Sequence, residues 1–233
     1  LYGFVCSHPF YREWLDEKLL MYDDTIPVGQ TVWGQVILQY ALDAVEFARS
    51  QLRRAIEQMQ GDAAMEKAYL PAFASDLAQL NALYSTLRTG SWGEVCRQLQ
   101  TIRPERLGSL RGYEDDGKKQ LVQRMRKSAQ AVVAKLAEQL FCADEQEFAE
   151  DIRFLRPRIE TLFSLVLDYD RRLLAAKRER SLLDFADLEH FAVQLLVERR
   201  DGEYCKTPLA RQLSESFAFV LVDEYQDLSL IHI

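Results

Sequence analysis

The feature that most constrains the fold is a single uninterrupted apolar segment near the end of the chain, residues 217–222. Six aromatic, aliphatic and β-branched residues in a row are typical of a strand buried on both faces of a parallel sheet. No other convincing strand is present in the 233 residues, and one strand cannot form a sheet. We therefore expect the neighbouring strands to lie outside this chain and the segment to be exposed in the isolated chain.

Most of the remaining sequence predicts helices, because apolar residues recur at every third or fourth position. The long helices are expected over residues 41–59, 63–87, 118–140 and 157–177, and shorter ones over 92–99, 185–198 and 210–214. Pro71 is expected to kink or split the second helix, and Pro157 to occupy the first turn of the fourth. Glycines are concentrated in residues 89–117, which therefore predict a loop around one short helix. The expected fold class is mostly α.

Composition excludes several classes of protein. No segment reaches the roughly 18 uncharged apolar residues of a membrane-spanning helix, and the start does not resemble a signal peptide. Four cysteines and three histidines are dispersed, so we expect reduced thiols in a cytoplasmic protein and no metal site of soft ligands. The net charge of −7 argues against a protein that coats DNA, but it permits a local basic groove.

An acidic sequence, Asp-Glu-Tyr-Gln-Asp, follows the apolar segment directly at residues 223–227. The carboxyl ends of buried parallel strands are where open α/β sheets bind their ligands. Nucleotide hydrolysis needs one carboxylate to hold Mg²⁺ and a second group to orient and activate the attacking water. The alternative is an inert acidic turn that caps a strand.

Residues 222–227, Val-Asp-Glu-Tyr-Gln-Asp, resemble the second conserved motif, the Walker B motif, of UvrD/Rep-like superfamily 1 DNA helicases. The resemblance implies that Asp223 binds Mg²⁺ and that Glu224 acts as the catalytic base. It also implies that Gln226 senses the nucleotide state and couples it to DNA. ATP and Mg²⁺ are the implied cofactors.

A second sequence, Leu-Asp-Phe-Ala-Asp-Leu at residues 183–188, resembles a segment that precedes this motif in the same helicases. Asp184 is expected to cap a helix and Asp187 to add a favourable charge in its first turn. The apolar residues of this helix are expected to form a buried face: Phe185, Leu188, Phe191 and Ala192. We expect the segment to pack the motor domain rather than to perform chemistry.

Residues 183–192, 168–172 and 1–15 together resemble the AddA subunits of bacterial AddAB helicase–nucleases. The resemblance implies that residues 1–180 form a helical 1B-type insertion subdomain. Residues 181–227 would then be part of the RecA-like motor domain 1A and would end at its Walker B motif, so that one buried strand represents an incomplete α/β domain. Residues 228–233 match a translated transposon adapter and are expected to be a foreign tail.

The resemblance implies a subunit that couples ATP hydrolysis to translocation on DNA and to its unwinding, in double-strand-break repair by homologous recombination. The implied substrates are double-stranded DNA ends and single strands. An AddB-type subunit is the implied partner, the parent protein is also expected to be an exonuclease, and the bacterial cytoplasm is the expected location. Two alternatives stay open, a UvrD/Rep-type helicase without nuclease and a helical interaction module without catalysis.

The chain contains no G-x-x-x-x-G-K-[ST] phosphate loop, and it begins at Leu1 rather than at a methionine. We therefore expect an internal fragment that is inactive by itself, with the phosphate loop upstream.

Residues 103–127 carry eight basic and four acidic residues, a local excess of four positive charges in an acidic chain. Lys118, Lys119 and Arg124 are therefore candidates to contact DNA phosphates, with an ordinary solvated surface as the alternative. Residues 171–180 carry a second basic group, which could also contact phosphates or could be a cationic helix C-terminus. Four aromatic residues are expected to pack in the core rather than to stack on bases: Trp33, Tyr40, Tyr69 and Trp92.

Overall fold

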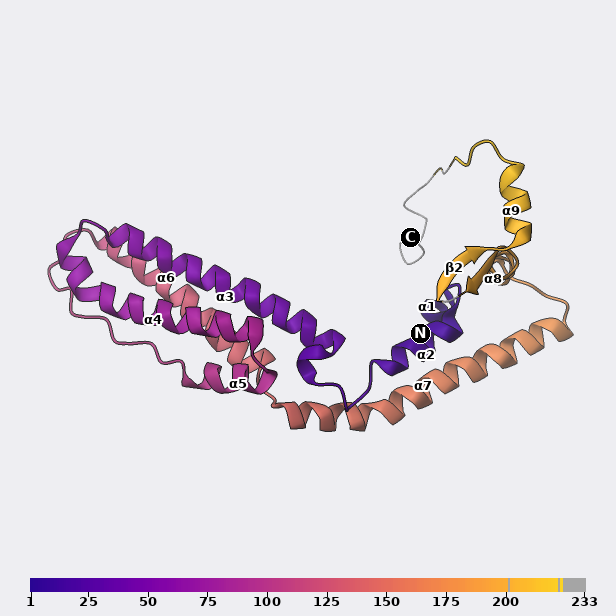
Figure 1. The fold of residues 1–233 in the computed structure, drawn as a ribbon, viewed down its shortest axis with the longest axis horizontal. Coiled ribbons are helices and arrows are strands. Elements are labelled where there is room, and N and C mark those ends of the chain that lie inside the picture. Colours follow the sequence, from indigo (N-terminus) through magenta and orange to yellow (C-terminus); the bar gives the residue numbers. More distant parts are fainter. Residues whose placement is uncertain (201, 222, 224–233) are drawn as a thin grey trace. The chain divides into compact units, whose positions relative to one another are not determined.

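The computed structural model describes residues 1–200, 202–221 and 223, and the chain divides into two compact units (Figure 1). Unit 1 consists of Leu1–Tyr22 and the residues from Leu155 onward, and unit 2 is Asp23–Phe154. The described residues form helices and one two-stranded antiparallel sheet, so the mostly α fold class is confirmed. The boundary expected after residue 180, between the helical insertion and the motor domain, stays a prediction.

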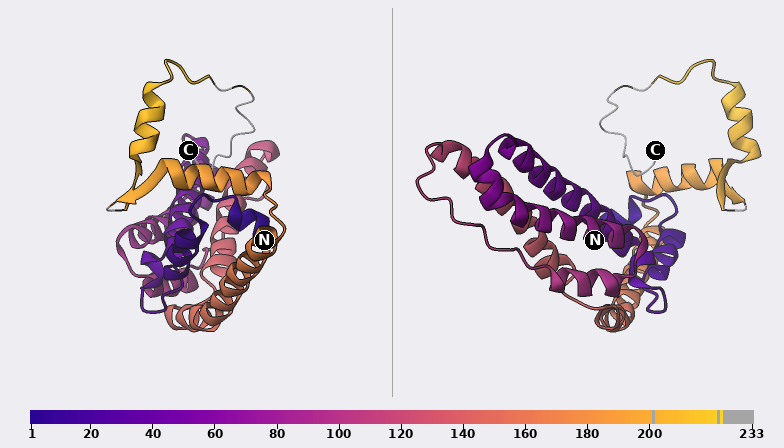
Figure 2. Two further views of the ribbon diagram at one scale, coloured as in Figure 1. Left: turned by 90° about the vertical axis from the view of Figure 1, so that its right-hand side faces the viewer. Right: turned by 60° about the vertical axis from the view of Figure 1, so that its left-hand side comes forward.

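Unit 2 is a bundle of long helices in which α3 packs along both α4 and α6 (Figures 1 and 2). Its elements are η1 (Val28–Gln30), α3 (Val32–Met59), α4 (Ala63–Thr89), α5 (Trp92–Thr101), α6 (Asp116–Lys135), the π-helical turn η2 (Leu136–Leu140) and the beginning of α7 (Glu145–Glu179). The predicted periodicity defines the core, since Val45, Leu52 and Met59 of α3 are buried at helical spacing. Each such side chain contributes roughly 1.5–3 kcal/mol by leaving water.

The start of α3 lies nine residues before the predicted one, because Thr31 caps it. The Thr31 hydroxyl accepts the Gly34 N–H at 3.0 Å and donates to the Val28 carbonyl at 2.7 Å. A Cβ atom on Gly34 would lie 1.8 Å from that carbonyl oxygen, so only glycine lets η1 fold back onto the helix. The cap and the glycine together set this corner of the bundle.

Residues 102–115, here called the strap, connect α5 to α6 along the side of α4. Gln79 of α4 holds the strap by two hydrogen bonds with the backbone of Arg103, of 2.9 and 3.1 Å. Further along, the Gly108 N–H donates to the Ala68 carbonyl at 2.9 Å. Ala68 lies three residues before Pro71. Helix α4 is continuous through Pro71, so the predicted split of the helix does not occur. A proline removes one helical donor but can be tolerated where other contacts support the helix.

The end of the strap makes unit 2 sensitive to acid. The Tyr113 hydroxyl donates to the carboxylate of Asp62, the N-cap of α4, and Lys118 pairs with the same carboxylate at 3.2 Å. The Tyr113 hydrogen bond, and after it the Met65 N–H, lowers the pKa of Asp62 to about 2. The unfolded-state pKa is about 3.9. A lowered folded-state pKa gives stability that is present above pH 4 and is lost as the pH falls toward 2.

We therefore expect Tyr113→Phe to destabilise unit 2 at pH 6 and to have little effect near pH 2, because protonated Asp62 no longer attracts the hydroxyl. Urea unfolding of both forms across this pH range measures the difference. Tyr84→Phe is the control, since its hydroxyl has no hydrogen bond within the described chain. A Tyr113→Phe penalty that is the same at both pH values would contradict this account.

Unit 1 is built from short elements around the second part of α7. They are α1 (Tyr2–Cys6), α2 (Tyr11–Leu20), α8 (Phe185–Leu196), β1 (Val197–Arg200), β2 (Glu203–Lys206) and α9 (Pro208–Glu215). A small core joins α1 and α2 to α7 through Val5, Leu15 and Val166. Pro208 occupies the first turn of α9, where a missing N–H costs nothing.

Helix α7 begins at Glu145, so the predicted start at Pro157 is wrong. Asp144 accepts the N–H groups of Gln146 and Glu147, both at 2.9 Å, and Glu147 accepts the Asp144 N–H at 2.9 Å. This reciprocal cap starts the helix upstream of the proline. Pro157 then lies in the interior of the helix.

The prediction that the chain has no strand besides 217–222 is also wrong. Helix α8 ends at Leu196, two residues before its predicted end, and β1 and β2 pair as an antiparallel hairpin from Val197↔Lys206 to Arg200↔Glu203. Gly202 in the turn has φ +86°, a conformation that glycine adopts without strain. The dipeptide Asp-Gly at 201–202 was the available signal, since it favours two-residue hairpin turns.

The predicted buried strand is not formed in the described residues 217–221, which belong to no sheet. Their large side chains are exposed, with Phe219 at 84% and Leu221 at 92%. Val222 lies outside the described residues. Because a parallel strand needs neighbours to satisfy its backbone groups, the segment stays unpaired and exposed, as expected for the isolated chain.

Candidate functional site

The predicted nucleotide-site residues follow this exposed segment. Asp223 is described and exposed. Glu224 and Gln226 lie outside the described residues. The mutual geometry of the three therefore stays a prediction from the sequence.

The predicted cap of α8 is confirmed. The Asp184 carboxylate accepts the Asp187 N–H at 3.0 Å, and the Asp187 carboxylate accepts the Asp184 N–H at 2.9 Å. The Lys177 ammonium near the end of α7 donates to both carboxylates, at 2.6 and 2.8 Å. This contact lowers the pKa of Asp184 and raises the pKa of Lys177. The segment thus connects the end of α7 to the start of α8.

The predicted buried face of α8 is wrong for this chain. Phe185 is 85% exposed, Leu188 is 50% exposed, and Phe191 and Ala192 are exposed as well. The residue of α8 that is buried is Asp187, which the cap and Lys177 hold. Helix α8 contacts α9 and β1, but these contacts leave the four side chains exposed in the described chain.

A buried carboxylate joins two of the segments that carry the family resemblance. Asp170 of α7 accepts hydrogen bonds from the hydroxyls of Tyr2 at 3.1 Å and Tyr11 at 2.7 Å, and from the Arg12 guanidinium at 3.0 Å. Burial, and after it the hydrogen bond to Asp170, raises the pKa of Tyr11 to about 12. Asp170 is 3% exposed and has one charged and two neutral donors, so it anchors α1 and α2 to α7.

The three candidate DNA-binding residues differ in their surroundings on α6. Lys118 is half-buried and paired with Asp62, and Lys119 pairs with Asp116 at 3.9 Å. Arg124 is exposed and has no ion pair within the described part of the chain. Of the three, Arg124 is thus the residue whose charge is most available to a ligand.

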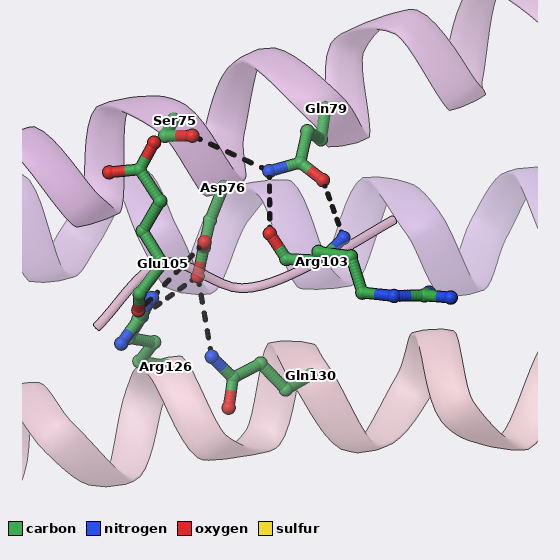
Figure 3. A network of polar contacts seen from close by, with 7 residues as sticks. All are labelled: Ser75, Asp76, Gln79, Arg103, Glu105, Arg126 and Gln130. Carbon is green, nitrogen blue, oxygen red and sulfur yellow. Dashed lines mark hydrogen bonds and ion pairs between the residues drawn. The ribbon is translucent and has the colours of Figure 1, made fainter. Parts of the chain in front are cut away.

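Arg126 belongs to the bundle interior rather than to a DNA-binding face (Figure 3). Its guanidinium donates to the two carboxylate oxygens of Asp76 at 2.8 and 3.1 Å, and to the Glu105 carbonyl of the strap at 2.6 Å. Arg126 and Asp76 are both 7% exposed. Arg126 is one of the eight basic residues of this region, and nothing in the sequence distinguishes it from the exposed cations.

In the second basic group and in the aromatic set, some residues are paired or buried and others are exposed. Arg171 and Arg172 both pair with Asp168 of the preceding turn. Tyr69 and Trp92 are buried, as predicted. Tyr40 is 47% exposed and Trp33 is half-buried, so the core prediction holds for only part of the aromatic set.

Two features are absent from the described residues. No helix among them combines the length and the apolar character that crossing a membrane requires. Within the same residues, no group of three or more histidine, cysteine, aspartate or glutamate side chains is placed to hold a metal ion.

Comparison with known proteins identifies the family. Residues 39–233 match the UvrD/REP helicase N-terminal domain. The chain is 28% identical over 99% of its length to the A subunit of the ATP-dependent helicase/nuclease of Ruminiclostridium cellulolyticum. It is 30% identical to the protein of the same name from Acetivibrio thermocellus, and 35% identical over 97% of its length to that of Bacillus mycoides.

The chain spans 19%, 19% and 18% of the length of these three relatives, respectively. The resemblance that the sequence indicated, to UvrD/Rep-like helicases and to their AddA-type members, is confirmed. Because the family match covers most of the chain and extends through the acidic sequence at 223–227, the chain belongs to the UvrD/REP helicase N-terminal domain family.

Proposed function

We propose that this chain is part of an ATP-dependent DNA helicase subunit of the helicase/nuclease type. The observation that carries the proposal is the acidic sequence 223–227, which directly follows the apolar segment and lies inside the family match over residues 39–233. The names of the relatives, which are A subunits of ATP-dependent helicase/nucleases, support the same function.

In this proposal Asp223 holds Mg²⁺, Glu224 accepts a proton from the attacking water, and Gln226 senses the nucleotide. Carboxylate oxygens are the ligands that Mg²⁺ prefers, and Asp223 is an exposed carboxylate. The metal ion would neutralise charge on the phosphates of ATP. Glu224 would orient and activate the water, which is the usual role of a second group beside the metal-binding carboxylate.

The proposed organisation is the one that the sequence predicts. Residues 1–180 belong to a helical 1B-type insertion and residues 181–227 to the motor domain 1A, while residues 228–233 are a foreign tail. The parent protein would process double-stranded DNA ends with an AddB-type partner during recombinational repair in the bacterial cytoplasm, and would also be an exonuclease. The strand at 217–222 would pair with strands that the rest of the motor supplies.

The direct test uses the full-length protein that contains this chain. ATP hydrolysis is measured with and without double-stranded DNA ends, and unwinding and degradation of the same DNA are followed in parallel. We expect hydrolysis to depend on DNA. Unwinding without degradation would favour a UvrD/Rep-type helicase, and no DNA-dependent hydrolysis would favour the helical interaction module.

The basic residues of α6 give a second test of the proposed DNA binding. We expect the triple substitution Lys118→Glu, Lys119→Glu and Arg124→Glu in the full-length protein to weaken duplex binding. The slope of log affinity against log salt should fall by about one unit for each DNA phosphate that is no longer neutralised. Fluorescence anisotropy of a labelled duplex, measured at several salt concentrations, gives both quantities.

A matched control separates local binding from net charge. Arg54, Lys67 and Arg88 are exposed elsewhere in unit 2, and their replacement by glutamate changes the net charge equally. Arg124→Glu alone breaks no ion pair within the described chain, so it tests the DNA contact without loosening the Asp62 cluster. An unaltered salt slope in both α6 variants would return this surface to an ordinary solvated one.

A further inference from the structure

Unit 2 contains a cavity of about 250 Å³ beneath the strap. Its walls come from α3, α4, α5, the strap, α6 and η2, and most of the lining side chains are apolar. Leu80 and Leu99 form one part of the wall, and Val133, Ala134 and Ala137 form another. The part of the wall that α6 and η2 supply includes three alanines, Ala129, Ala134 and Ala137.

One edge of the cavity is polar and is formed by Asp76, Gln79, Arg103 and Gln130 (Figure 3). The Gln79 amide nitrogen donates to the Arg103 carbonyl and the Ser75 hydroxyl, and its oxygen accepts the Arg103 N–H and keeps one lone pair. In the Asp76 carboxylate, Oδ2 accepts from Arg126 Nε at 2.8 Å and from Gln130 Nε2 at 3.4 Å.

The second oxygen, Asp76 Oδ1, accepts from Arg126 Nη2 at 3.1 Å. A carboxylate oxygen has two lone pairs, so this oxygen can accept one further hydrogen bond. Because Arg126 neutralises the carboxylate, the edge does not demand a charged ligand. Asp76, Gln79 and Gln130 all offer acceptor oxygens, so the edge favours a neutral molecule that brings a hydrogen-bond donor.

The volume limits the size of the ligand. An engineered apolar cavity of about 150 Å³ in another protein holds benzene, so about 250 Å³ is suited to two fused rings. We propose that this cavity is a binding site for an indole ring, with its apolar faces against Leu80 and Val133 and its N–H directed at Asp76. The ring could come from a free small molecule or from a tryptophan side chain of a partner protein, and the site is independent of the nucleotide-binding function.

The test uses the complete 233-residue chain and indole as the probe. Methyl NMR spectra are recorded during a titration, and we expect saturable shifts of the Leu80 and Val133 methyl signals. A ligand of this size is expected to bind with a Kd of about 1 mM or tighter. The methyl signals of Val5 and Val166, which lie in the core of unit 1, serve as internal references and should not shift.

A variant pair on α6 tests the location. Ala134→Phe places a ring at the exposed side of the cavity, and it should weaken indole binding by about tenfold or more. Ala131→Phe makes the same change at an exposed position of α6 that does not line the cavity, and it should bind like the wild type. Equal indole affinity in these two variants would overturn the proposed site.

Two ligands complete the test without altering the protein. 1-Methylindole has no N–H donor and should bind about tenfold more weakly than indole, because it cannot form the hydrogen bond to Asp76. Equal binding would overturn the contact with Asp76. N-acetyl-L-tryptophanamide tests the source, since its binding shows that the site accepts a tryptophan side chain and its failure to bind restricts the site to a free molecule. No saturable shift with indole would overturn the proposal as a whole.

Discussion

Replacing Glu224 by glutamine in the full-length protein is expected to reduce DNA-stimulated ATP hydrolysis by about 100- to 10,000-fold, with nucleotide binding largely intact. This is the usual contribution of a positioned general base. Glutamine has nearly the shape of glutamate but cannot accept a proton from the attacking water, so the nucleotide should still bind. Steady-state hydrolysis and equilibrium binding of a fluorescent ATP analogue measure the two effects separately.

Glu215→Gln is the matched control, because Glu215 is an exposed carboxylate at the end of α9 and outside the acidic sequence. It should leave hydrolysis unchanged. If Glu224→Gln also hydrolyses ATP at the wild-type rate, Glu224 is not the catalytic base. The proposed roles of Asp223 and Gln226 would then need independent support, since all three rest on the same motif.

The largest effect on stability is expected from breaking the buried ion pair of unit 2. Arg126→Met leaves the carboxylate of Asp76 buried without its partner and frees the Glu105 carbonyl of the strap. Removing one member of a buried pair costs about 3–5 kcal/mol. Urea unfolding monitored by circular dichroism should therefore show a large decrease in the free energy of unfolding.

The double variant Asp76→Leu with Arg126→Met should recover most of this decrease, because an apolar pair of similar volume avoids the buried charge. Arg153→Met is the comparison for an exposed pair. Arg153 bonds Asp24 at 2.9 Å with a side chain that is 68% exposed, and its removal should cost less than about 1 kcal/mol. An Arg126→Met penalty of that smaller size would mean that water reaches the pair in solution.

The helices of the bundle were predictable because their information is local. Apolar residues at helical spacing identified α3, α4 and α6, and Asp184 followed by Asp187 identified the start of α8. Boundaries were less predictable where two local signals competed. At α7, Pro157 favoured a first turn, yet the reciprocal cap of Asp144 and Glu147 starts the helix further upstream.

The hairpin of unit 1 was missed for a different reason. Its strands are only four residues long, and Arg199, Arg200 and Glu203 give them no apolar alternation. The Asp-Gly dipeptide at 201–202 carried the local signal. The apolar segment 217–221 is the opposite case. Its sequence strongly favours a strand, yet it pairs with no strand among the described residues.

The sequence by itself determined the helical class of this protein and its family, because helix periodicity and a short contiguous motif are both encoded by residues close together in the chain. Only the tertiary structure decided which charges are available. It buries Arg126 against Asp76, gathers two tyrosines and an arginine on Asp170, and leaves Arg124 exposed. These outcomes depend on residues 50 to 168 positions apart, whose approach is set by packing of whole helices. Composition and residue spacing therefore do not show which of these distant residues come together.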